Sequence, residues 1–350
     1  MTFPLPLNDM LFAVAKVLFS VLGVGLSIAG FLGWVERKQS AVMQDRIGAN
    51  RASIFGFTII GLFHPIADAL KLLTKEDFVP KGAHKPLHGL APIISLGAGM
   101  FCLAALPYGG TVAVAGRLYD LQPIAMPMGV PLVLAALAFG VHGIVMAGYA
   151  SGSNYGLLGA LRGAAQMIAY EVVLSSSLAG ILFIYGSLDF AEAVRWQVAH
   201  GVWGIVLQPV AFILFLVAGV AVTKRIPFDL PEGESEIVGY HVEYSGMKFG
   251  MFMMTDFFES IVISGVITAL FLGGWAVPGL DLPAMGPLGG FLMVGSFVSK
   301  IMLMLFLLMQ VRWTLPRFRF DQVLDLGWKN LLPLALINFL VTAWAVYLWR

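Results

Sequence analysis

Eight long apolar runs constrain the fold of this chain more than any other feature. They lie near residues 11–34, 87–106, 130–149, 163–185, 203–222, 248–275, 288–309 and 330–349. Each has close to the roughly 20 residues that an α-helix needs to cross a bilayer. Lipid offers backbone polar groups no partners, and the alternating polarity of a membrane barrel is absent. The sequence therefore predicts an all-α, polytopic membrane protein with about eight transmembrane helices, forming a single domain over residues 1–350.

Composition agrees with this prediction, because 59% of the residues are hydrophobic and only 12% are charged. That is more apolar side chain than one soluble core could bury. The net charge of +1 gives no support for nucleic-acid binding. The single cysteine, Cys102, excludes a disulfide, a thiolate zinc site or an iron–sulfur cluster built from this chain alone. Any metal or redox cofactor is therefore expected in a partner.

The distribution of Lys and Arg predicts how the helices are oriented. Connections 36–86, 150–162, 223–247 and 310–329, with the adjoining helix ends, carry 16 of the 21 basic residues, and the intervening connections carry only Arg117 and Arg195. Basic connections remain in the cytoplasm. We therefore expect a bacterial cytoplasmic membrane protein with both termini on the periplasmic side; an organelle membrane is the alternative. The first run lacks a basic leader and a small-residue cleavage site, which favours a retained helix.

Two patterns lie in the connections that we expect in the cytoplasm. His64, Asp68 and Lys71 recur at helical spacing, which predicts an amphipathic helix on the membrane surface within residues 55–75. This helix is either a simple connector or a site for a partner or ligand. Glycines 156, 159 and 163 begin the fourth run and are typical of close helix packing.

Ionisable residues inside the apolar runs mark candidate functional positions, because burying them in a membrane is costly. At 1.5 Å per residue, Glu171, Asp256, Lys300 and His142 all fall about 10–14 Å from the cytoplasmic helix ends. This shared depth predicts a polar, proton-handling layer. The alternatives are a structural ion pair between Lys300 and Glu171, and an interior histidine without a ligand. Lys16 is expected to extend toward the outer surface.

The connection 223–247 is rich in acids, which is unusual for a cytoplasmic connection. It carries Asp229, Glu232, Glu234, Glu236 and Glu243, next to Lys224 and Arg225. Carboxylates that cannot all ionise cheaply form a group whose protonation responds to nearby charge. A solvated acidic loop is the alternative, although Pro231, Ile237 and Tyr240 favour a packed segment.

Five strings in the sequence are specific enough to indicate a family. They are WVERKQSAVMQDRIGAN, HPIADALKLLTKE, ASGSNYGLLGALRGAAQMIAYEV, RIPFDLPEGESEIVGYHVEYSG and LPRFRFDQVLDLGWKNLLPL. Over nearly its whole length the chain resembles the family of the H-type membrane subunit (mitochondrial subunit 1) of respiratory complex I. The resemblance implies a membrane subunit of a proton-translocating NADH:quinone oxidoreductase. Quinone would be its substrate, and the other membrane and peripheral-arm subunits its partners, with no redox cofactor of its own.

The resemblance also implies roles for particular residues. The quinone tunnel would involve Glu36, Arg37, Lys38, Gln44, Arg46, Asp68, Lys71 and Phe228. Proton coupling would involve Glu171, Asp229, Glu232, Glu234, Glu236, Glu243 and Asp256. The interface with the peripheral arm would involve Arg312, Arg317, Arg319 and Asp321.

The chain departs from the family pattern at several of these positions. Val222 and Lys224 stand where the family usually has Glu and Asn, Asp256 replaces a Glu, and His64 replaces a Gln. These departures leave open a homologous subunit of a membrane-bound hydrogenase, or of a dehydrogenase linked to ferredoxin or deazaflavin. A solitary transporter is a further alternative, although the inverted repeats and broken helices typical of one are absent. A purely structural anchor would explain the topology but not the shared polar depth.

Overall fold

The structure is a computed structural model that describes residues 7–349 apart from 115–116, 234–235, 238 and 281. In this part of the chain, seven helices are long and apolar enough to cross a membrane. The first joins α1 (Leu7–Leu18), the π-helix η1 (Phe19–Leu26) and α2 (Ser27–Met43), and the last joins α12 (Phe320–Asp325), the π-helix η4 (Leu326–Leu331) and α13 (Leu332–Trp349). Between them are α4 (Lys85–Ala105), α5 (Gly129–Ala150), α6 (Asn154–Tyr185), α10 (Gly246–Phe271) and α11 (Gly286–Thr314). The all-α, polytopic fold class is confirmed.

The fifth predicted helix is shorter than its apolar run. Residues 203–222 form one turn, α8 (Gly204–Leu207), and then α9 (Pro209–Val222). The break falls at Gln208, whose φ of −136° is not helical. Pro209 starts the second helix because it has no N–H to lose at that position. The Gln208 side chain donates to Thr342 Oγ1 at 2.6 Å, so the break is tied to α13.

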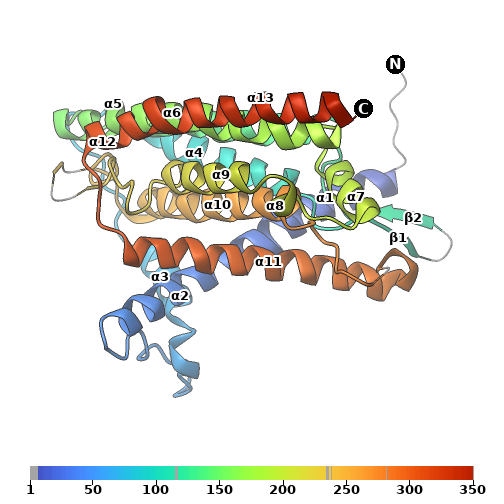
Figure 1. The fold of residues 1–350 in the computed structure, drawn as a ribbon. Coiled ribbons are helices and arrows are strands. Elements are labelled where there is room, and N and C mark those ends of the chain that lie inside the picture. The colour runs from blue at the N-terminus through green and yellow to red at the C-terminus, as the bar shows by residue number, and fades with distance from the viewer. Residues whose placement is uncertain (1–6, 115–116, 234–235, 238, 281, 350) are drawn as a thin grey trace.

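The helices form a bundle whose connections separate into two ends (Figure 1). One end carries α7 (Phe190–His200), the start of α1, the end of α13 and an antiparallel hairpin of β1 (Thr111–Val114) and β2 (Arg117–Asp120). Near it lies the short 3₁₀-helix η3 (Leu282–Met285). The other end carries α12 and the connection between α9 and α10. Lys16 Nζ donates to Asp120 O and Gln122 O at 3.0 and 2.8 Å, so it ties α1 to the hairpin's end and does not simply extend to the surface.

The surface helix predicted within residues 55–75 is α3 (His64–Thr74), which follows a short 3₁₀-helix, η2 (Ile59–Gly61). With α2 it protrudes beyond the bundle (Figure 1). None of its residues is fully buried, and its contacts are with α2 and α10. The exposed apolar side chains Ile66, Leu70 and Leu73 suit a helix at a membrane surface.

The glycines of α6 pack against a connection rather than only against another helix. A Cβ at Gly163 would lie 2.9 Å from Pro231 Cγ, and one at Gly159 would lie 3.3 Å from Pro231 O and Tyr240 N. At Gly156 the predicted close helix packing is present, since a Cβ at Gly148 of α5 would lie 2.8 Å from Gly156 O. Small residues on α6 let the acidic connection lie directly on the helix, which holds the connection in place.

Candidate functional site

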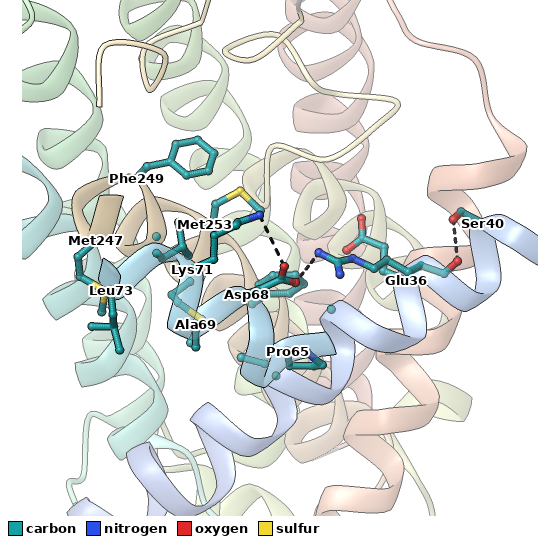
Figure 2. A pocket seen from close by; sticks show the side chains of 18 of the residues that line it. Glu36, Ser40, Pro65, Asp68, Ala69, Lys71, Leu73, Met247, Phe249 and Met253 are labelled. Atoms are coloured by element: carbon teal, nitrogen blue, oxygen red, sulfur yellow. Dashed lines mark hydrogen bonds and ion pairs between the residues drawn. The ribbon is translucent and has the colours of Figure 1, made fainter. Parts of the chain in front are cut away.

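An elongated apolar pocket of about 530 Å³ lies between α2, α3 and α10, at the end of the bundle that carries the acidic connection. Its walls are made mainly by small and apolar residues, among them Ala29, Gly30, Gly33, Leu72, Met247, Met253, Met254, Phe257 and Trp313. Figure 2 shows Met247, Phe249 and Met253 on one side and Glu36 and Ser40 toward the other. A pocket of this size, apolar with few polar groups, suits a hydrophobic small molecule.

Charged side chains from α2 and α3 line the same pocket. Arg37 Nη2 lies 2.5 Å from Asp68 Oδ2, and Lys71 Nζ lies 3.8 Å from Asp68 Oδ1 (Figure 2). Glu36 is held by two cations, since Arg225 Nη1 lies 3.3 Å from its Oε2 and Arg312 Nη1 pairs with its Oε1. The pocket therefore combines apolar walls with a fixed set of charges.

The structure brings only half of the predicted tunnel residues to this pocket. Glu36, Arg37, Asp68 and Lys71 line it. The others lie elsewhere: Lys38 Nζ approaches Ile47 O at 3.4 Å, Arg46 Nε donates to Gln44 Oε1 at 2.7 Å, and Phe228 is buried between Tyr170 and Phe318. His64 is also outside the lining, and its Nδ1 lies 2.8 Å from Gly61 O.

Three carboxylates of the acidic connection are each paired with a base. Arg317 Nη2 lies 2.7 Å from Asp229 Oδ2, and Arg162 pairs with Glu236. His241 Nδ1 lies 3.7 Å from Glu232 Oε1. Asp229 and Asp256 still repel the Glu232 carboxylate, so the predicted coupling among the acids stays a prediction.

The other two acids of the connection are Glu243 and Glu234. The backbone oxygen of Glu243 lies 3.2 Å from His88 Nε2 of α4. Glu234 lies outside the described residues.

Two carboxyls of the connection are held in environments that favour their neutral form. Burial raises the pKa of Asp229 above its ordinary value, although the Arg317 guanidinium opposes this. Burial, with a further contribution from Asp256, raises the pKa of Glu232 to about 8. Glu232 is therefore poised to exchange a proton near neutral pH.

A buried ion cluster lies where the connection meets α10. Lys224 Nζ is 2.7 Å from Asp256 Oδ1 and 3.3 Å from Glu259 Oε2, and the Lys224 side chain is only 1% exposed. Sequence reasoning had assigned Asp256 but missed Glu259, and it placed Lys224 beside the loop acids. The available signal was a second acid at the i+3 position of the same apolar helix, which faces the same way as the first.

The prediction that four groups share one polar layer is partly wrong. Lys300 Nζ donates to the oxygens of Leu272, Gly274 and Ala276 at 2.7–2.9 Å, where α10 ends on the opposite side of the bundle. It forms no ion pair with Glu171. His142 is exposed on α5. Glu171 is partly buried on α6, and its carboxylate is close enough to that of Glu259 for the two to repel each other. The layer therefore contains Asp256, Glu259 and Lys224, with Glu171 near it.

The residues predicted to meet the peripheral arm divide into two pairs. Arg312 and Arg317 turn toward Glu36 and Asp229 of this chain. Arg319 and Asp321 are exposed and pair with each other, with Nε to Oδ1 at 2.6 Å. Arg319 and Asp321 therefore lie apart from the charged site, and the contact of these four residues with the peripheral arm stays a prediction. Among the described residues, no group of three His, Cys, Asp or Glu is placed to hold a metal ion.

Comparison with known proteins agrees with the family that the sequence strings indicate. A family model described as NADH dehydrogenase matches residues 15–343. The chain is 42% identical to the H-type subunit 1 of NADH-quinone oxidoreductase from Geobacter metallireducens over 341 residues, which are 97% of this chain and 98% of the relative. It is 40% identical to the H-type subunit of NADH-quinone oxidoreductase from Aquifex aeolicus over 332 residues, 93% and 94% of the two chains.

Proposed function

Since this chain belongs to the NADH dehydrogenase family, we propose that it is the membrane subunit of a proton-translocating NADH:quinone oxidoreductase in a bacterial cytoplasmic membrane. In this proposal both termini face the periplasm, and the pocket end of the bundle meets the peripheral arm, with Arg319 and Asp321 at the interface. The chain supplies no redox cofactor of its own and acts on quinone together with the other subunits.

The observation that carries the proposal is the pocket between α2, α3 and α10. Its apolar walls suit the isoprenoid chain and ring of a quinone, and it lies at a membrane-surface helix, from which a lipid-soluble molecule can enter. Arg37, Asp68 and Lys71 give the pocket a polar lining that can orient the carbonyl groups of the ring. Glu36 lies at the point where the pocket meets the acidic connection.

Coupling to proton movement follows from the charges next to the pocket. Glu36 is paired with Arg225, which lies in the same connection as Asp229, Glu232, Glu236 and Glu243. Negative charge formed on a reduced quinone would alter this balance of charge. Protonation of the connection would then change, and with it the proton occupancy of Asp256 and Glu171 on the membrane helices α10 and α6.

Filling the pocket tests the proposal. In membranes that contain the whole complex, Met253→Trp should lower the rate of NADH:quinone reduction and raise the KM for quinone, because the indole occupies the binding volume. Reduction of a soluble artificial acceptor by NADH should be unchanged, because it does not need the pocket. Met285→Trp is the matched control: Met253 and Met285 are 45% and 43% exposed, and Met285 lies at the other end of the bundle.

Two results would oppose the proposal. If the Met253→Trp complex reduces quinone with an unchanged KM, the pocket is not the quinone site. If the purified wild-type assembly oxidises hydrogen or reduced ferredoxin but not NADH, the electron donor is wrong and the related hydrogenase or ferredoxin-linked class is correct.

A further inference from the structure

Lys224 is the most deeply buried cation among the ion pairs of the described residues. It follows α9 directly and takes a left-handed backbone conformation, with φ of 55°, which turns its side chain into the bundle. The Gln166 side chain of α6 holds this turn, because its Nε2 donates to Ala221 O at 2.6 Å and to Phe228 O at 2.8 Å. These hydrogen bonds fix the backbone on both sides of Lys224 and so fix the position of its ammonium group.

The charges around Lys224 do not balance when all of them are ionised. One ammonium faces two carboxylates, Asp256 and Glu259, whose side chains are 17% and 4% exposed. A net negative charge in a poorly solvated site is costly, and the binding of a single proton removes it. Although burial lowers the pKa of Lys224, Asp256 and Glu259 raise it well above its usual value, so the lysine keeps its own proton. The exchangeable proton therefore belongs to the two carboxylates.

Neighbouring residues connect this site to the pocket. Arg225, next to Lys224 in the chain, pairs with Glu36 and lies over the ring of Phe257 at 4.7 Å. Both Glu36 and Phe257 line the pocket, and Phe257 follows Asp256 on α10. A shift of Arg225 toward negative charge in the pocket would therefore move the same turn that positions Lys224.

We propose that Lys224, Asp256 and Glu259 form a proton-loading site in which Lys224 limits the load to one proton. A proton taken from cytoplasmic water converts one carboxylate to a carboxylic acid, and its release restores the carboxylate, with no electron transferred. Lys224 acts through the two acids and is a positioning residue. The inference rests on the proposed function, because it assumes that quinone reduction drives loading and release.

Other ionisable groups face the site from each element around it and set its surroundings. They are Tyr240, Glu232 and Asp229 of the connection, Arg225 of the turn, Glu171 of α6 and Cys102 of α4. None of these groups replaces Lys224, because in the described residues it is the cation paired with both acids.

Counting charges gives a test that distinguishes this role from packing. Lys224→Met keeps most of the side-chain length and leaves two carboxylates without a cation, of which one holds a proton permanently and the other can still load and release one. Glu259→Gln leaves a neutral Lys224–Asp256 pair, which takes up no proton. Glu259→Gln alone should therefore lower the protons pumped per NADH by about twofold or more, whereas Lys224→Met and the double variant Lys224→Met with Glu259→Gln each keep one exchangeable carboxylate and should pump within about twofold of wild type.

The assay measures proton uptake by inverted membrane vesicles together with NADH:quinone reduction, and native gels report assembly. Lys329→Met is the control, since Lys329 pairs with Asp325 in an exposed i,i+4 pair at 2.8 Å. If Glu259→Gln alone pumps at the wild-type ratio, the proposal is overturned, even where Lys224→Met fails to assemble. A double variant that pumps no better than Glu259→Gln alone assigns Lys224 to packing and also overturns it. If wild-type vesicles neither reduce quinone nor pump, the proposed function itself is wrong.

Discussion

Gln166 offers the sharpest test of how the fold positions the charged turn. Its amide donates to Ala221 O and Phe228 O, and the side chain is fully buried. Gln166→Leu has a similar size but leaves Phe228 O without its donor, while Ala221 O keeps the backbone N–H of Lys224 at 3.2 Å. At about 1–3 kcal/mol for a buried acceptor left unpaired, the docked turn loses about 1–3 kcal/mol. Even the lower figure changes the ratio of docked to undocked turn by about fivefold.

The expected result is a turn that opens more often, carrying Lys224 and Arg225 away from their partners. In Gln166→Leu membranes, hydrogen exchange should be faster over residues 221–230, and protons pumped per NADH should fall. Ser176→Ala, which removes an exposed side-chain donor to Val172 O on the same helix, should leave both measurements unchanged. Unaltered exchange over residues 221–230 in an assembled Gln166→Leu complex would refute the reasoning that this amide holds the turn.

Three further predictions concern other parts of the chain. Gly163→Val should weaken assembly by about 1–3 kcal/mol on native gels, because its side chain meets Pro231, whereas Gly97→Val, with nothing within 4 Å, should not. Lys16→Met removes two charged hydrogen bonds to the hairpin's end, each worth about 1.5–3 kcal/mol. The hairpin should therefore open more often, and a protease should cleave it faster. The pKa of Glu232 near 8 exceeds its ordinary value of 4.5, so the folded form binds the extra proton and stability falls as pH rises between these values. Glu232→Gln should therefore flatten the stability profile of the complex between about pH 4.5 and 8 and its activity profile around pH 8, and an unchanged activity profile would contradict this.

The membrane architecture could be predicted from the sequence because it depends on local properties. Each span is defined by its own run of apolar residues, and the surface helix α3 by the spacing of its own side chains. Helix α9 is the exception: Pro209 starts it late, and only the packing of α13 around Gln208 makes the shortened helix acceptable.

The candidate site could be predicted only in part. Asp68 and Lys71 share one helix face, as their spacing predicts, and line the same pocket as Arg37, while their role in a quinone tunnel stays a prediction. Lys300 was misplaced because depth along a helix does not specify the direction around its axis. Glu259 was missed although it stands three positions after Asp256, because only the packing of both acids against Lys224 shows that the two form one site.

The sequence by itself determined that this chain crosses a membrane, which connections are basic, and to which family it belongs. Only the tertiary structure decided which acid meets which base. Lys224 and Asp256 are separated by more than thirty positions in the chain, and the turn after α9, the glycines of α6 and the face of α10 must all be in place before they meet at 2.7 Å. An ion pair buried from water depends on such packing, because its energy is set by the distance and solvation of the whole surroundings and not by either residue alone.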